Sequence, residues 1–333
     1  MKKRIAPAAA ATTGLMVLAL AASAGSTPPG GNGPIVFRRF LDKKNTSALF
    51  VINPDGSGER QLTHPATGVA DNHPSWAPDG SRVVFERCGK NRCATETVAA
   101  DGTDLRPLGA PCRHGAAPTP KCDERGAPAW SPDGESIVFN RAYGPIKHDT
   151  IKYSGLAVAD PTGAHLRNLV MSKPYAGDLR DGAWSPDGKR LVLTVSNTAR
   201  AKPAKGMALF LINADGTGLH RLTPWKLRAD QGSWSPDGRQ IIFHSTRADD
   251  ETFGGGLYTI RPDGTGVTEL IAPQRHKLIL RPSFSPDATA ITFAGSGLQD
   301  AADIEIANAD GTSPRAVTHT VAWDSSPDWQ PRR

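Results

Sequence analysis

The sequence predicts an all-β protein, a six-bladed β-propeller of four-stranded antiparallel blades, from three observations. An aromatic residue beside a Pro-Asp-Gly-like turn recurs six times, 45 to 54 residues apart. An Asp-Gly-Thr-like turn follows about thirty residues after each of the first five elements, and a sixth copy, Pro54-Asp55-Gly56-Ser57, precedes the first element. The two ends of the chain also hold complementary parts of one further unit. A repeat near 50 residues with two turn signals per unit is typical of repeat architectures.

The first repeated element predicts a tight hairpin next to a large ring. Four copies read Trp-Ala/Ser-Pro-Asp-Gly, the fifth ends in Ala288, and the last is the fragment Pro327-Asp328-Trp329. Proline presets φ, aspartate hydrogen-bonds its own backbone, and glycine accepts a positive φ. We expect each ring to pack in the seam between two neighbouring blades, where its burial stabilises the fold. The six aromatic residues are Trp76, Trp130, Trp184, Trp234, Phe284 and Trp329.

One unit shows the four strands of a blade. The segment at Ser233-Trp234 is the first strand, and residues 241–244, 257–260 and 267–271 are the next three. Short runs of β-branched and aromatic residues, bounded by Gly, Pro and Asp, are typical of strands. Because no segment of the unit sustains a 3.6-residue period, helices are the weaker interpretation. Four antiparallel strands form one propeller blade.

The chain ends predict a composite blade. The C-terminus supplies only a first strand, around Trp329, whereas residues 35–37, 49–52 and 60–63 match a second, third and fourth strand. We expect the C-terminal strand to join the N-terminal strands, because closing the ring removes open sheet edges that invite aggregation. Five internal units and this composite unit give six blades.

The repeats also resemble a known family. Trp-Ser-Pro-Asp-Gly, the Ile-Val-Phe-like strand after it and the Asp-Gly-Thr…Leu-Thr ending are similar to the six-bladed propeller of TolB and its relatives. The resemblance covers residues 34–333 and implies the fold. TolB carries an α/β domain before its propeller, and prolyl oligopeptidase-like enzymes carry a hydrolase domain after theirs. We expect neither domain here, so the resemblance is to the propeller alone.

The N-terminus has the features of an export signal, which gives three expected segments. Lys2-Lys3-Arg4 precede an apolar stretch from Leu15 to Ala22, and Ala22-Ser23-Ala24 is an Ala-x-Ala cleavage site. A retained membrane anchor is the alternative, but the apolar run is short for one. We expect a signal peptide at 1–24, a Gly/Pro spacer at 25–33 and the β-propeller domain at 34–333. The protein would then be exported, periplasmic or extracellular, with no integral membrane segment after cleavage.

Composition excludes some partners. The full chain has a net charge of +6, and removal of the three basic residues of the signal leaves about +3. No basic stripe with interleaved aromatic residues is present, so we expect no nucleic-acid partner. We expect a monomer that binds a protein or peptide partner.

Four cysteines suit an oxidising compartment. Local pairing of Cys88 with Cys93 and of Cys112 with Cys122 is the simplest of three connectivities. A Cys₄ zinc site, with His114 nearby, is the alternative. The spacings of the cysteines do not match a usual zinc knuckle.

Polar residues cluster just before the predicted innermost strands, at the expected channel mouth. One hypothesis is a ring that binds a divalent cation or the basic groups of a peptide. The alternative is that these side chains hold neighbouring strands together. The candidate partner-binding residues are Asp71, His73, Asp178, Arg180, Asp181, Asp230, Arg281 and Asp324, and their neighbours are Asp123, Glu124 and Gln231. Tyr175, Trp225 and Trp323 are further candidates for binding.

Catalytic signals are scarce. The sequence lacks His-Glu-x-x-His, Gly-x-Ser-x-Gly, a phosphate loop and a dinucleotide fingerprint. We therefore predict no catalytic residues and no cofactor, with a divalent cation in the channel as an open alternative. The predicted function is a protein- or peptide-binding scaffold at the cell envelope or outside the cell. The alternative is a propeller enzyme, a polysaccharide lyase or glycoside hydrolase, whose His, Arg, Tyr and carboxylate groups would converge at the channel mouth.

Overall fold

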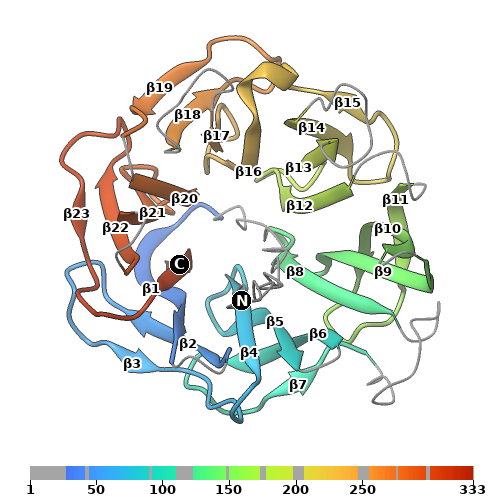
Figure 1. The fold of residues 1–333 in the computed structure, drawn as a ribbon, viewed down its shortest axis with the longest axis horizontal. Coiled ribbons are helices and arrows are strands. Elements are labelled where there is room, and N and C mark those ends of the chain that lie inside the picture. The colour runs from blue at the N-terminus through green and yellow to red at the C-terminus, as the bar shows by residue number, and fades with distance from the viewer. Residues whose placement is uncertain are drawn as a thin grey trace, which may run out of the picture.

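The fold is known from a computed structural model. It describes residues 28–41, 45–89, 92–109, 123–147, 150–172, 178–197, 206–246, 255–274, 277–297 and 301–332. These residues are almost entirely β-strand, with one short 3-10 turn, η1 (Trp225–Leu227). The strands stand around a common centre, and the shorter outer strands lie at the rim (Figure 1).

Four sheets have four antiparallel strands each. The first contains β8 (Glu124–Trp130), β9 (Ile137–Lys147), β10 (Thr150–Ala159) and β11 (Arg167–Ser172); the second contains β12 (Asp178–Trp184), β13 (Arg190–Asn197), β14 (Gly206–Asn213) and β15 (His220–Arg221). The third contains β16 (Ala229–Trp234), β17 (Ile241–Ser245), β18 (Gly256–Ile260) and β19 (Thr268–Ile271); the fourth contains β20 (Lys277–Phe284), β21 (Ala290–Gly297), β22 (Asp303–Asn308) and β23 (Arg315–Ala316).

The other eight strands form one sheet from two antiparallel sets. One set is β24 (Asp324–Arg332), β1 (Gly31–Phe40), β2 (Ser47–Ile52) and β3 (Arg60–Gln61); the other is β4 (Ala70–Trp76), β5 (Arg82–Gly89), β6 (Arg92–Ala99) and β7 (Arg106–Pro107). A single parallel pair, Ser47 with Ala70, connects the two sets.

The expected joining of the chain ends is present. β24 pairs antiparallel with β1, with Ile35 opposite Trp329, and the two strands lie side by side in Figure 1. β1 begins at Gly31, so the pairing extends into the predicted spacer. The innermost strands β4, β8, β12, β16, β20 and β24 each contact the next, and β24 contacts β4. The innermost strands β24 and β4 are therefore neighbours in the same way as successive innermost strands inside the chain.

The repeated aromatic residues pack between successive sheets, as predicted. Trp184 lies in a core cluster with Val138 and Leu156 of the preceding sheet. Trp329 packs against Ile304 of the preceding sheet and Phe37 of its own. Every ring is buried against the set of four strands before it, so the seams between these sets are the main apolar cores of the molecule.

The turns form as their sequences predict. In the turn after Trp184, the Asp187 carboxylate accepts hydrogen bonds from the Ser185 hydroxyl and the Lys189 N–H, and Gly188 has φ 67°. The Asp215 carboxylate accepts from both the N–H and the hydroxyl of Thr217. These local bonds fix the hairpins independently of the rest of the fold.

One strand differs from the sequence-based expectation. The expected fourth strand at residues 60–63 contains only Arg60 and Gln61, because the Thr63 hydroxyl instead accepts a hydrogen bond from the Leu49 N–H. Strands β9 and β10 are long, and they pair as far as Thr150 opposite Lys147, with Tyr143 opposite Tyr153. The β-branched and aromatic residues of this segment favour strand.

No helix in the described part of the chain is both long enough and apolar enough to cross a bilayer.

The β24 strand should be essential to stability. Trp329 is 1% exposed in the seam where the chain ends meet, so Trp329→Ala should lower the free energy of unfolding by about 3 to 5 kcal/mol. Val321→Ala is the matched control, because this nearby side chain is fully exposed and should change stability by less than about 0.5 kcal/mol. Urea unfolding followed by tryptophan fluorescence measures both. Equal midpoints for wild type and Trp329→Ala would refute the role of this seam.

Candidate functional site

Each innermost strand is interrupted at the same place, three residues before its aromatic residue. Strand pairing shifts register there, and the residue at the shift has a left-handed backbone. None of these residues is glycine, so each is held in a sparsely populated conformation by its surroundings. A bulge of this kind changes the direction of a side chain. We call these residues the bulge ring: His73, Ala127, Asp181, Gln231, Arg281 and Ser326, with φ of 46° to 60°.

Neighbouring sheets support the bulge ring through its backbone. The Asp181 N–H donates to Asn140 Oδ1 at 3.2 Å, and the Gln231 N–H donates to Thr194 Oγ1 at 3.2 Å. The Arg281 N–H donates to Gln231 Oε1 at 2.8 Å. Each acceptor belongs to the preceding sheet, so the ring ties successive sheets together near their common centre.

The supporting residues occupy equivalent positions on the second strands. Each follows an apolar residue in the middle of its strand, as Asn140 follows Phe139 and Thr194 follows Leu193. We call these residues the support ring: Arg38, Glu86, Asn140, Thr194, His244 and Ala294. Where the support residue is a short polar side chain, it caps the next bulge. Where the support residue is Arg38, Glu86 or His244, its longer side chain can make other contacts.

His73 and Glu86 form a buried pair. His73 Nδ1 is in contact with Glu86 Oε2, and both side chains are almost fully buried. Burial lowers the pKa of His73 to about 4, and the nearby Arg281 and Arg38 act in the same direction. The imidazole is therefore neutral near pH 7, and the carboxylate fixes its tautomer with the proton on Nδ1.

Asp181 is a carboxyl group in an unusual setting. It is fully buried, and neither of its oxygens accepts a hydrogen bond from the described residues. Its nearest cation is Arg180, whose Nε lies 3.5 Å from Oδ2 and whose Nη2 lies 3.6 Å from Asp230 Oδ2. Burial raises the pKa of Asp181 to about 7, against the opposing effect of Arg180.

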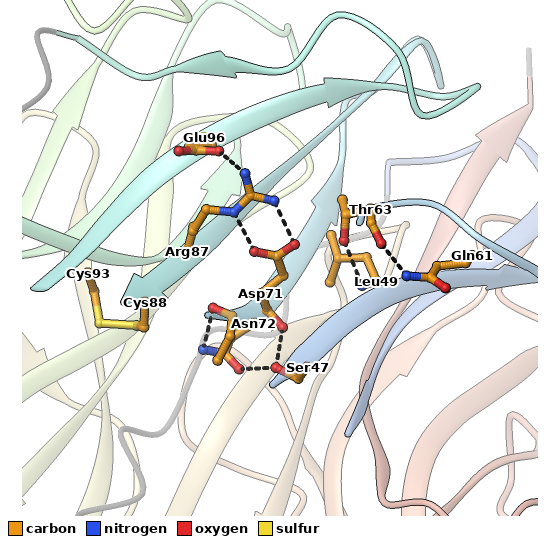
Figure 2. A network of polar contacts seen from close by, with 11 residues as sticks. Ser47, Leu49, Gln61, Thr63, Asp71, Asn72, Arg87, Cys88, Cys93 and Glu96 are labelled. Carbon is orange, nitrogen blue, oxygen red and sulfur yellow. Dashed lines mark hydrogen bonds and ion pairs between the residues drawn. A yellow bond between two sulfur atoms is a disulfide. The ribbon is translucent and has the colours of Figure 1, made fainter. Parts of the chain in front are cut away.

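Two other acids of the predicted mouth, Asp71 and Asp324, are each bound by an arginine side chain. Both oxygens of Asp71 accept from Arg87, at 2.6 and 2.8 Å, and Arg87 also donates to Glu96 (Figure 2). Asp324 is held by the Arg39 guanidinium at 2.8 Å for each oxygen. These acids connect adjacent strands of one sheet, so their charge is neutralised within the fold.

Other predicted residues have separate positions. The Asp123 carboxylate bonds Arg125 at 2.9 Å and also contacts Arg141. Glu124 begins β8 and Asp178 begins β12, opposite Ser196. The bulges therefore bring only part of the predicted set together, namely His73, Arg180, Asp181, Asp230, Gln231 and Arg281.

The Cys88–Cys93 disulfide is confirmed, with an S–S distance of 1.97 Å across β5 and β6 (Figure 2). The predicted Cys112–Cys122 pair lies outside the described residues. The Glu86 carboxylate is near both sulfurs of the 88–93 pair. Because a disulfide offers no thiolate, these three residues do not make a metal site.

The aromatic candidates have structural contacts. Trp225, in η1, packs against Phe210 with ring centroids 5.9 Å apart. The Trp323 carbonyl accepts from the Phe40 N–H at 3.1 Å. Tyr175 lies outside the described residues.

Sequence reasoning missed Arg38 and His244. His244 is buried, and neither of its ring nitrogens has a hydrogen-bond partner among the described residues. A Cβ atom at Gly255 would lie 2.0 Å from His244 Nε2, so any larger residue there would displace the imidazole. The available signal was a polar residue in the middle of an apolar strand, as in Ile241-Ile242-Phe243-His244.

Because the Asp181 carboxyl is buried, we expect the stability difference between wild type and Asp181→Asn to depend on pH. Its folded pKa of about 7 exceeds the ordinary 3.8, so the folded state gains a proton before the unfolded state as the pH falls. The ionised carboxylate therefore destabilises the folded state fully above pH 7, and protonation removes this destabilisation as the pH falls toward 4. Asp181→Asn keeps the shape without the charge, and should be more stable than wild type at about pH 8, by a margin that shrinks by about 2 kcal/mol at about pH 5. Urea unfolding at both pH values measures this margin, and a constant margin or a less stable variant at pH 8 would contradict the assignment.

Solved structures define the fold by comparison, whereas no family model and no curated protein sequence matches the chain. TolB from Acinetobacter baumannii is 16% identical, with a TM-score of 0.70, over 92% of this chain and 68% of that one. A putative TolB from Agrobacterium tumefaciens is 16% identical, with a TM-score of 0.61, over 90% and 100%. An oligogalacturonate lyase from Vibrio parahaemolyticus is 13% identical, with a TM-score of 0.52, over 81% and 73%. The chain therefore has a TolB-like propeller fold.

Proposed function

We propose that the protein is an exported, closed six-bladed propeller that binds a protein or peptide partner at the cell envelope or outside the cell. Six blades account for the six bulges and for the cycle of contacts among the innermost strands. The eight-stranded sheet then counts as two blades that share one parallel residue pair, and the β24–β1 pairing closes the ring. Export is supported by the signal-like N-terminus and by the Cys88–Cys93 disulfide, which suits an oxidising compartment.

One observation supports ligand binding above the others. Buried polar groups from different sheets converge near the common centre without hydrogen-bond partners among the described residues. They include the Asp181 carboxylate, both nitrogens of His244 and Nη1 of Arg281. Buried polar groups in folded proteins are normally paired with protein or ordered water. The bulge ring also holds strained backbone, which is concentrated at functional sites. A ligand at the centre of the ring would supply the missing partners.

An enzyme is the second candidate, because His73, Glu86 and the nearby Arg281 form a combination that could move a proton. The neutral imidazole is fixed by Glu86, which leaves Nε2 able to accept a proton. Among the similar structures, one is an oligogalacturonate lyase in complex with manganese, 14% identical, with a TM-score of 0.51 over 87% of this chain and 74% of that one. A lyase acting on an acidic polysaccharide is the enzyme that we would test.

The two functions can be separated with one pair of variants. The double variant Asp181→Asn/His244→Gln removes central groups, and Arg239→Gln removes an exposed guanidinium in the β16–β17 turn. If the protein is a binding scaffold, wild type and Arg239→Gln should capture the same partner from an envelope fraction. The double variant should lose at least about tenfold in affinity, the equivalent of one charge-assisted hydrogen bond.

An activity assay tests the alternative that the protein is a lyase. Oligogalacturonate with manganese would give an unsaturated product in ultraviolet absorbance if the protein is a lyase. Turnover by wild type that is lost in His73→Ala would replace the binding proposal with the enzyme. If wild type, the double variant and Arg239→Gln all capture the partner equally, the partner binds outside the bulge ring and the proposed central site is refuted.

A further inference from the structure

Three neighbouring side chains near the centre of the ring are all hydrogen-bond donors without acceptors. Arg38 Nε, Arg281 Nη1 and Ser326 Oγ are inaccessible to solvent, and none has a partner in the described part of the chain. The Arg281 side chain is 9% exposed and Ser326 is 5% exposed. No hydrogen bond or ion pair joins either guanidinium group to a described residue, and the Arg38 guanidinium lies over the Phe40 ring, 3.9 Å from its centroid.

The fold places these residues together. Arg38 lies opposite Ser325 in the β1–β24 pairing, next to the bulge that contains Ser326. Arg281 occupies the equivalent bulge of β20, and β20 contacts β24 directly. The two guanidinium groups are close enough to repel one another: the pKa of Arg38 is lowered to about 10, first by burial and then by Arg281.

Other buried or half-buried arginines in the chain have direct carboxylate partners. Arg39 and Arg87 each hold a buried carboxylate with two short hydrogen bonds, and Arg141 contacts Asp123. Arginine stays charged even when buried, so a guanidinium without an acceptor destabilises the fold. Arg38 and Arg281 therefore lack the contacts by which this protein stabilises its other buried guanidinium groups.

Nearby carboxylates of the described residues offset part of the positive charge of Arg38 and Arg281 without hydrogen-bonding to either guanidinium group. Glu86 is engaged by His73, and Asp230 is near Arg180. Asp181 and Asp230 act on Arg281 through space, without direct contact. These anionic groups would repel a doubly charged phosphate more strongly than a singly charged carboxylate. A planar carboxylate also matches the guanidinium fork.

We propose that Arg38, Arg281 and Ser326 form an anion site that takes a carboxylate of a peptide ligand, either an acidic side chain or the C-terminus. This inference rests on the proposed function and names the group that the central site recognises. The proposed site has the opposite charge to the acidic ring expected from the sequence, because it contains two guanidinium groups and a neutral hydroxyl. The two arginines would form charge-assisted hydrogen bonds to the carboxylate oxygens, and Ser326 would add a third donor.

Isothermal titration with defined probes tests the site. The probes are acetyl-triglycine, its C-terminal amide, digalacturonate and inorganic phosphate, all at matched ionic strength. Wild type and Arg239→Gln should bind acetyl-triglycine but not the amide. Arg281→Gln and Arg38→Gln should weaken binding by at least about tenfold, the loss expected for one charge-assisted bond. Binding of digalacturonate or phosphate with no binding of the peptide acid would overturn the proposal, as would equal binding of acid and amide.

Stability separates a binding role from a structural one. Without ligand, Arg281→Gln should melt at or above the wild-type temperature, because an unpaired buried charge is removed. A lower melting temperature, together with unchanged probe binding, would show a structural arginine. Partner capture separates the carboxylate site from the proposed partner-binding function. If Arg281→Gln still captures the partner, only the carboxylate site is refuted. Probe binding by a protein that captures no partner would refute only the wider function.

Discussion

The bulge in each innermost strand is the constraint on which the central site depends. Without it, the residue three positions before each aromatic would follow the regular alternation of the strand. With it, His73, Asp181 and Arg281 sit in left-handed conformations supported from the neighbouring sheet. The aromatic residue three positions after each bulge is buried in the seam between sheets. Its packing holds the strand in place on the C-terminal side of the bulge. Seam packing and backbone strain therefore act together, and the apolar cores stabilise a geometry that the ring residues would not adopt alone.

Charge pairing differs between the acids that precede the bulges and the charged residues at the bulges. Asp71 and Asp324 have both carboxylate oxygens bound by an arginine on the adjacent strand. Asp181 and Arg281 occupy bulge positions and lack such bonds among the described residues. Unpaired buried charges destabilise a fold, and proteins retain them chiefly where a ligand uses them. The same chain thus contains a fully paired structural set and an unpaired set, and the second set supports the proposed binding role.

Sequence reasoning predicted the fold well because its signals are local. The Pro-Asp-Gly turns, the seam position of Trp184 and the pairing of Cys88 with Cys93 each follow from short segments or their repetition. The site was harder to predict because its contacts are not local. Nothing near Asp71 in the chain identifies Arg87 as its partner, since register across two strands decides it. A bulge likewise leaves no compositional mark when its residue is not glycine. Arg38 on β1 also has no local signal, because only its pairing with β24 places it beside the Ser326 bulge.

A crystal structure of the protein grown with 4-bromobenzoate would show whether a carboxylate binds at the bulge ring, because bromine is located by its anomalous signal. We expect the carboxylate within hydrogen-bond distance of Arg38 and Arg281, with Ser326 as a third donor. The Arg281 guanidinium should not pair with Asp181 in the same structure. Bromine found only at exposed arginines such as Arg239, with Arg281 bonded to Asp181 and no ligand at the centre, would refute the carboxylate site.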